Sequence, residues 1–278
     1  MSVSGTISGE DNCSNVLSVP LSKPYFDGTE IAEIEKTLKS GWVTQGPMIG
    51  QFEESVCNYV NAKFAVASSN CTTAMHLAWL ILGVGPGDEV LCPSYSFIAS
   101  ANAIRHAGAE PIFVDIDRAT LNMDANATRE AILQNYDSKL INTSTGRKLK
   151  AILVVHQIGI PCDLDAFKTL ADQYNLHLVE DAACAIGSEY KNTRIGGSGN
   201  ICAFSFHPRK VITTGEGGML TMASEQLASK ARVYRAHGMS VSDLDRHKSS
   251  STTFEKYEVV GYNYRMTDIQ ASVGVCQM

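Results

Sequence analysis

The sequence has no apolar stretch that approaches the roughly 18 residues of a membrane helix. It also has no excess of basic residues, since its 278 residues carry a net charge of −6, which argues against nucleic acid as a partner. The N-terminal stretch MSVSGTISGEDNCSN has neither a basic region nor an apolar core, so it does not predict a signal peptide. We expect a disordered leader over residues 1–18 of a soluble chain that binds no membrane.

The eight cysteines form no CxxC pair and no other tight metal-ligand spacing. Most of them lie in apolar or Ala/Ser-rich segments, where a free cysteine behaves as a small hydrophobic residue. The pattern therefore predicts reduced thiols in a cytoplasmic protein, with no metal site. The cysteines are residues 13, 57, 71, 92, 162, 184, 202 and 276.

Helical and strand patterns alternate along most of the chain. Helical spacing of apolar residues predicts helices at 27–41, 71–83, 97–108 and 164–175, and another that follows the Gly-Pro pair at 46–47. Short apolar runs predict strands at 63–69, 89–94, 111–117, 150–159, 176–183, 202–207 and 217–224. Continuous Val, Ile and Leu runs between helices indicate an α/β fold with a mainly parallel sheet covered on both faces. In such sheets, ligands bind beyond the carboxyl ends of the strands.

Two charged residues lie where this rule places a ligand. Lys210 closes an expected strand in the segment CAFSFHPRKVITTGEGG, between aromatic residues and a glycine-rich turn. A lysine is usually a solvated surface charge, but a partly desolvated one can lose its proton near neutral pH and attack an aldehyde. Asp181 ends another strand, where an aspartate is often only a helix cap. Together the two residues provide what pyridoxal phosphate (PLP) requires, an amine for the Schiff base and a carboxylate for the pyridine nitrogen.

Other candidates lie at neighbouring strand ends. The segment SSNCTTAMHLA (68–78) predicts a helix start whose free N–H groups could bind phosphate through Cys71 and Thr72, although a plain capping box would look the same. Ser205 could add a second hydroxyl. Phe97 could stack on a planar ring or be a core residue. We interpret His76 as packed on a helix face, whereas His156 could touch a ligand or be a hydrogen-bonded core histidine.

Taken together, these segments resemble the DegT/DnrJ/EryC1/StrS family, PLP-dependent sugar aminotransferases of the aspartate aminotransferase fold (fold type I). The resemblance covers about residues 19–278, and its most specific part is FSFHPRK followed by TTGEGG, at a matching distance from VEDAA. The matching stretches are SGWVTQGP (40–47), NCTTAMHLAWLILGVGPGDEV (70–90), PSYSFIASANAI (93–104), EPIFVDID (110–117), VEDAACAIGS (179–188), FSFHPRKVITTGEGGM (204–219) and GYNYRMTDIQASVG (261–274).

The resemblance implies a role for each candidate. Lys210 would form the Schiff base and act as the catalytic base, and Asp181 would pair with the pyridine nitrogen. The other cofactor-binding residues would be Cys71, Thr72 and Ser205 on the phosphate, Phe97 on the ring, and Asn263 on the phosphate of the neighbouring subunit. The active unit would then be a homodimer with its sites at the interface. Cys184 is a departure, because many relatives carry Gln or His at that position.

The resemblance also implies a domain plan and an activity. Residues 19–260 would form the PLP-binding large domain, a three-layer α/β sandwich, and residues 261–278 would start a small C-terminal domain that is truncated. The activity would be amino transfer from an amino acid, glutamate, to a keto group of a nucleotide-linked sugar or of a cyclitol. Two alternatives come from other classes. The chain could be an inactive PLP-binding remnant or dimerisation partner of a full-length relative, or a regulator that senses a sugar nucleotide.

Overall fold

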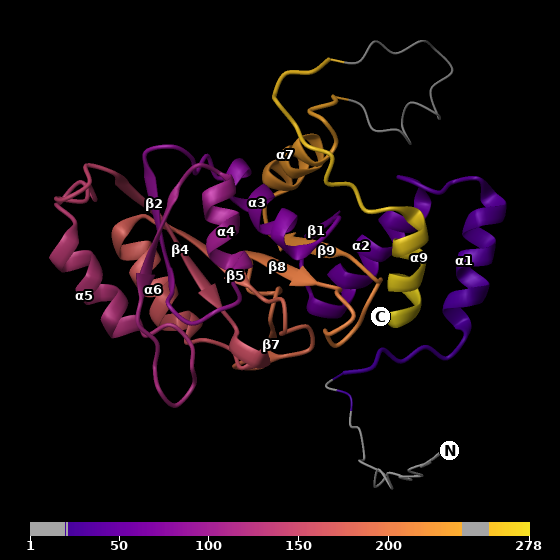
Figure 1. The fold of residues 1–278 in the computed structure, drawn as a ribbon, viewed down its shortest axis with the longest axis horizontal. Coiled ribbons are helices and arrows are strands. Elements are labelled where there is room, and N and C mark those ends of the chain that lie inside the picture. Colours follow the sequence, from indigo (N-terminus) through magenta and orange to yellow (C-terminus); the bar gives the residue numbers. More distant parts are fainter. Residues whose placement is uncertain (1–19, 21, 241–255) are drawn as a thin grey trace, which may run out of the picture.

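The computed structural model describes residue 20, residues 22–240 and residues 256–278, and in it a seven-stranded sheet lies between layers of helices (Figure 1). The strand order is β1-β9-β8-β5-β4-β2-β3, and β9 runs in the direction opposite to the other six strands. The expected α/β fold with a mainly parallel sheet is confirmed. The strands are β1 (Phe64–Ser68), β2 (Asp88–Pro93), β3 (Glu110–Val114), β4 (Lys148–Val155), β5 (His177–Asp181), β8 (Ile201–Ser205) and β9 (Gly218–Met222). A separate hairpin contains β6 (Glu189–Tyr190) and β7 (Thr193–Arg194).

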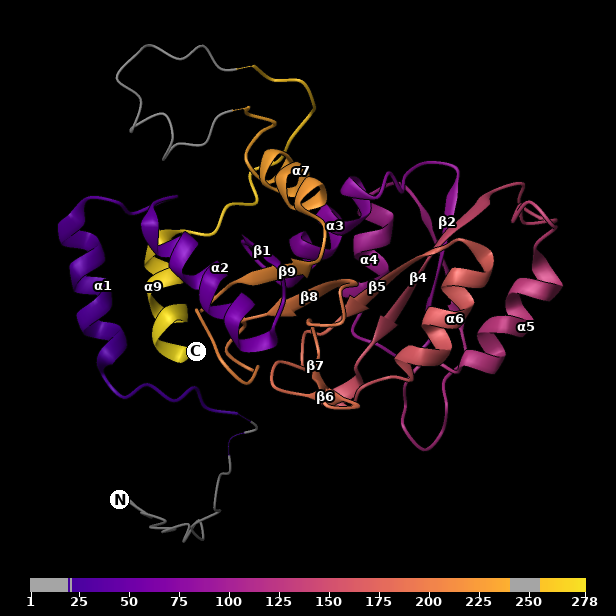
Figure 2. The ribbon, with the colours of Figure 1, turned by 180° about the vertical axis from the view of Figure 1, so that it is seen from behind.

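Helices cover both faces of the sheet (Figure 2). One face packs against α3 (Cys71–Ile81), α4 (Ala99–His106) and α7 (Glu225–Arg235). The other face packs against α2 (Pro47–Val60), α5 (Ala125–Asn135) and α6 (Leu164–Tyr174). Helix α9 (Asp268–Gln277) packs against α2, and α1 (Thr29–Ser40) lies beside α9 at one end of the molecule in both views. In the described parts of the chain, no helix combines the length and apolar character that crossing a membrane requires.

The alternation of side chains along each strand divides the core into two. In β4, Ala151 and Leu153 pack with the α3 side, whereas Ile152 and Val154 pack with the α2 and α6 side. Both sets are buried, which explains why the strand is apolar at every position from residue 151 to its end at Val155. Burying a Leu, Ile or Val side chain stabilises the fold by roughly 1.5–3 kcal/mol, so both helical layers are held to the sheet by the same strands.

Some elements differ from the predictions in extent. The apolar run that predicted a strand over 150–159 ends as β4 at Val155, and the short 3₁₀ helix η1 (Gln157–Gly159) follows. Ile158 in η1 has a left-handed φ of 53°, so the backbone turns sharply where an extended chain was expected. Lys210 does not close a strand, because β8 ends at Ser205 and the lysine lies in the loop beyond it.

Two helices and one hairpin were not predicted at all. Helix α5 buries only Thr128 and Ile132, and α7 buries Ala228, Ala231 and Arg235, so neither shows a wide apolar stripe. The strands β6 and β7 are two residues long and give no period to detect. The leader expected over 1–18 lies outside the described residues, and the domain boundary at residue 260 stays a prediction.

A buried carboxylate fastens α9 to α2. The side chain of Asp268, in the first turn of α9, accepts hydrogen bonds from the backbone N–H groups of Gly46 (2.8 Å), Met48 (3.1 Å) and Ile49 (3.2 Å). These N–H groups start α2 and have no partner within that helix. Gly46 is required because a Cβ there would lie 2.4 Å from a carboxylate oxygen of Asp268. One side chain thus caps a helix more than 200 residues away in the sequence.

Replacing Asp268 with alanine is expected to lower the free energy of unfolding by about 2–4 kcal/mol, because three buried donors lose a charged acceptor. Thermal or urea denaturation measures the change. The matched control is Asp124→Ala, which removes the half-buried cap of α5 and should cost about 1 kcal/mol. Equal losses in the two variants would contradict the special role of Asp268.

Candidate active site

A cavity of about 780 Å³ lies at the carboxyl-terminal edge of the sheet. The ends of β1, β5 and β8 open into it, as expected for a parallel sheet. Six of the seven predicted site residues line the cavity: Cys71, Thr72, Phe97, Asp181, Ser205 and Lys210. The seventh, Asn263, does not line it and is exposed, with its backbone bridged to Ala236.

The helix α3 points its N-terminus at the cavity. Asn70 is the N-cap, and its side chain accepts from the Thr73 N–H (2.9 Å) while the Thr73 hydroxyl accepts from the Asn70 N–H (3.2 Å). Of the two alternatives posed for this segment, the capping box is present, and it does not exclude the phosphate site, which stays a prediction. The box occupies the N–H of Thr73 only, and those of Cys71 and Thr72 have no partner among the described residues. Two donors therefore remain for an anion at the positive end of the helix.

A glycine allows this helix start to approach the sheet. A Cβ on Gly218, at the beginning of β9, would lie 2.3 Å from the carbonyl of Asn70 and 2.6 Å from the nitrogen of Cys71. Only a residue without a side chain fits this approach. The last glycine of the TTGEGG turn thus has a steric function that is visible only in the folded chain.

Asp181 forms the floor of the cavity and is 5% exposed. One carboxylate oxygen accepts from the hydroxyl of Ser100 (2.8 Å) and the other from the N–H of Ala183 (3.1 Å). Burial raises the pKa of Asp181 above its usual value, although these hydrogen bonds and the charges of Lys210 and His156 act in the opposite direction. The site thus holds a carboxylate whose charge is only partly compensated.

Lys210 lies on a loop that is anchored at its base. Phe206 is fully buried and exchanges backbone hydrogen bonds with the far side of the loop, donating to Gly217 (2.9 Å) and accepting from Thr214 (3.0 Å). The half-buried Lys210 extends its amine to the sulfur of Cys184, 3.2 Å away. Cys184 thus contacts the candidate base directly.

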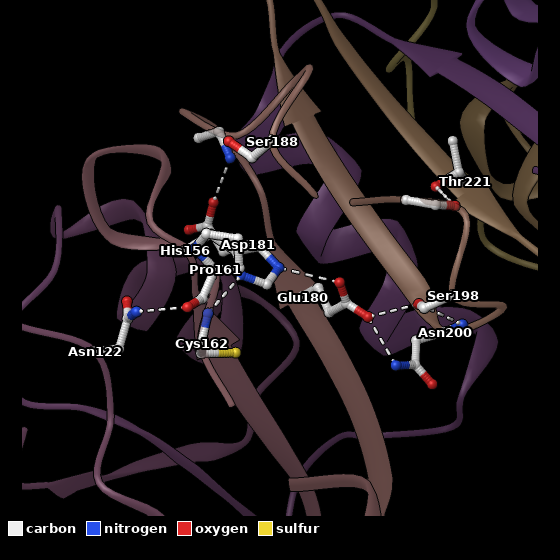
Figure 3. Close-up of polar contacts among 12 residues, drawn as sticks. Asn122, His156, Pro161, Cys162, Glu180, Asp181, Ser188, Ser198, Asn200 and Thr221 are labelled. Carbon is white, nitrogen blue, oxygen red and sulfur yellow. Dashed lines mark hydrogen bonds and ion pairs between the residues drawn. The ribbon is translucent and has the colours of Figure 1, made fainter. Parts of the chain in front are cut away.

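His156 lies on the opposite side of the sheet from Asp181 and does not line the cavity. Figure 3 shows its ring directed at Glu180, with 3.0 Å between Nε2 and the carboxylate, while the N–H of Cys162 donates to Nδ1 (3.2 Å). Glu180 also accepts from Ser198 (2.8 Å) and Asn200 (2.7 Å). Of the two interpretations of His156, the hydrogen-bonded core histidine is the one found.

The structure also shows whether His76 and Phe97 are packed in the core or face the cavity. His76 is packed and 2% exposed, as interpreted, but it also lines the cavity. Burial and the neighbouring His106 lower its pKa to about 4, so it is neutral at physiological pH. Phe97 is 73% exposed and is not a core residue, so its ring is free to cover a flat ligand.

Sequence reasoning missed several polar residues of the site, among them Ser100 and Tyr264. Ser100 was detectable, because it follows Phe97 by three residues and so falls on the same side of a helix start. Tyr264 follows Asn263 directly, and nothing in the sequence distinguishes it as the cavity-lining member of the pair. Among the described residues, no three His, Cys, Asp or Glu side chains are grouped as metal ligands.

An amine, a buried carboxylate and an anion-binding helix end in one cavity are the parts of a site for a phosphorylated, electron-withdrawing aldehyde cofactor. The family model of the "DegT/DnrJ/EryC1/StrS aminotransferase family" matches residues 24–278. The chain belongs to this family. Its members are PLP-dependent aminotransferases, and the recognition made from the sequence motifs is confirmed.

Individual relatives support the same assignment. The chain is 41% identical to the spore coat polysaccharide biosynthesis protein SpsC of Bacillus subtilis, over 94% of this chain and 64% of that protein. It is 39% identical to GDP-perosamine synthase of Caulobacter vibrioides, over 95% and 66%. A Streptococcus pneumoniae protein solved in its PMP form superposes with a TM-score of 0.82 at 31% identity, over 94% and 67% of the two chains, and it has also been solved in a PLP form. The chain thus spans about two thirds of the length of these relatives.

The partly compensated charge of Asp181 predicts a stability effect. Asparagine has the same shape and can still accept from Ala183, but it carries no charge, so Asp181→Asn is expected to raise the melting temperature of the cofactor-free protein at pH 7. A raised pKa in the folded state favours folding with the proton bound, and this contribution is lost as pH rises. The difference between variant and wild type should therefore shrink below about pH 4. A variant that melts lower than wild type at pH 7 would contradict the argument.

Proposed function

We propose that this chain binds pyridoxal 5′-phosphate and transfers an amino group from an amino acid, glutamate, to a keto group of a nucleotide-linked sugar. The observation that carries the proposal is the convergence of Lys210, Asp181 and the α3 N-terminus on one cavity. Family membership supports the cofactor and the reaction class. The name of GDP-perosamine synthase, a relative, supports a nucleotide-linked substrate.

The residues present fit the cofactor. The free N–H groups of Cys71 and Thr72, with the hydroxyls of Thr72 and Ser205, would hold its phosphate at the positive end of α3. The cavity volume of about 780 Å³ is within the usual range for cofactor sites. When bound, pyridoxal phosphate supplies an aldehyde that condenses with amines and a ring that withdraws electrons from the substrate carbon.

The chain's own residues then provide the proton chemistry. Asp181 would stay ionised opposite a protonated ring nitrogen, because a cation in the cavity offsets the burial that raises its pKa. Ser100 and the N–H of Ala183 fix both carboxylate oxygens, so the charge is directed into the cavity. The Lys210 amine would move the proton between the substrate carbon and the cofactor, because its loop holds it above the cavity floor.

We further propose that the chain works as a homodimer in the cytoplasm. Large apolar side chains are exposed around the cavity mouth, among them Phe97, Ile98 and Val211, and a second subunit would cover them. Asn263 lies outside its own cavity, which is consistent with its predicted contact to the neighbouring subunit's phosphate. The seven cysteines in the described residues are free thiols, as is usual in a reducing compartment.

Replacing Lys210 with alanine is expected to abolish turnover while the melting temperature stays within a few degrees of wild type, because the side chain is half-buried and on a loop. Purified wild-type protein with added PLP should show a visible absorption band that glutamate bleaches, and Lys210→Ala should lack the band. The matched control is Lys168→Ala, which removes an exposed lysine with only an ion pair to Asp172.

The results separate the alternatives. Wild-type turnover with Lys210→Ala would overturn the role of the lysine. A band that glutamate does not bleach would replace the transferase with the inactive PLP-binding remnant. Folded wild-type protein without any band would overturn the cofactor itself.

A further inference from the structure

Tyr264 lines the same cavity as Lys210, although no role has been assigned to it. Its position is fixed by the backbone, because its carbonyl accepts from the N–H of Ser69 (2.8 Å), one residue before the N-cap of α3. Its ring stacks on that of Tyr262, with 4.9 Å between the centroids and 18° between the planes. Its hydroxyl lies 3.0 Å from Nδ1 of His76. Tyr264 is therefore held in place, with its backbone next to the start of α3 and its hydroxyl against His76, in the second turn of that helix.

The hydrogen bond to His76 has a defined direction. His76 is 2% exposed, and its Nε2 has no hydrogen-bond partner among the described residues. Since the ring is neutral, its one proton is on either Nε2 or Nδ1. A proton on Nε2 would leave a buried donor unpaired, which is rarer and more costly than an unpaired acceptor. The proton therefore belongs on Nδ1, from which it is donated to the Tyr264 oxygen.

This direction leaves the proton of the Tyr264 hydroxyl free. Within the described chain, its oxygen contacts no hydrogen-bond partner other than His76. Burial raises the pKa of Tyr264, so the hydroxyl keeps its proton at neutral pH. Tyr264 lines the same cavity as the N-terminal residues Cys71 and Thr72 of α3, so its free O–H is a suitable donor for an anion bound there.

We propose that Tyr264 donates its hydroxyl proton to a phosphate oxygen of a ligand in this cavity, and that His76 is the positioning residue that aims it. The inference rests on the proposed function and adds a binding residue to it. The phosphate could belong to the cofactor or to a nucleotide-linked substrate, because both carry the same chemistry. The measurement must therefore separate these two sources.

The test compares Tyr264→Phe with Tyr262→Phe. The first removes only the hydroxyl that lines the cavity, and the second removes a hydroxyl from the stacked neighbour, which does not line it. Affinity is measured by absorbance titration with PLP and with pyridoxal, which lacks the phosphate. Calorimetric titration of PLP-loaded protein with UDP and with GDP measures the affinity for the nucleotide part of the substrate. Tyr264→Phe should weaken either PLP or a nucleoside diphosphate about tenfold, as expected for one hydrogen bond to a charged group. Pyridoxal binding and Tyr262→Phe should stay at wild-type values.

The positioning role of His76 has its own measurement. His76→Gln should weaken the same ligand, and the double variant with Tyr264→Phe should lose no more than Tyr264→Phe alone, because His76 acts through the hydroxyl. Additive losses would overturn that role. Unchanged affinity of Tyr264→Phe for PLP and for both nucleotides would overturn the phosphate contact while leaving the proposed function intact. A wild-type protein that binds none of these ligands would overturn both proposals.

Discussion

The cavity depends on two adjacent carboxylates that are buried at the end of one strand. Glu180 and Asp181 are neighbours on β5, so their side chains point to opposite faces of the sheet. Burying a carboxylate is unfavourable unless hydrogen bonds and opposite charges compensate it. Glu180 has three such partners in the core, His156, Ser198 and Asn200, whereas Asp181 has two donors and an open cavity.

This difference assigns a structural role to Glu180 and leaves Asp181 as the candidate for binding. The satisfied Glu180 network ties β4, β5 and the loop before β8 together below the cavity (Figure 3). The incompletely compensated Asp181 is left to interact with whatever cation enters from above. Burial of this charge lowers the stability of the empty protein, and a cation bound in the cavity would restore it, so the proposed ligand would stabilise the fold.

Much of the site was predictable because its parts are local. Three short motifs each place a candidate functional residue next to the end of a strand: the TTGEGG turn, the VEDAA strand end and the hydroxyl-rich helix start. Parallel strands bring such ends to one edge of the sheet. The hydrogen-bond partners that escaped prediction lie far apart in the sequence. Ser100 reaches Asp181 across 81 positions, and Tyr264 reaches His76 across 188. Helices α5 and α7 escaped for a different reason, since they bury too few large apolar residues to give a helical pattern.

The sequence by itself determined the fold class, the family and six of the residues that line the cavity, because apolar periodicity and short motifs are local properties of the chain. Only the tertiary structure decided which polar groups are paired. His156 proved to be a core residue because Glu180, on the neighbouring strand, lies within hydrogen-bond distance of it on the same side of the sheet. Asp268 proved to be the cap of α2 because α9 packs there. Hydrogen-bond partners are set by three-dimensional proximity, which one-dimensional patterns do not contain.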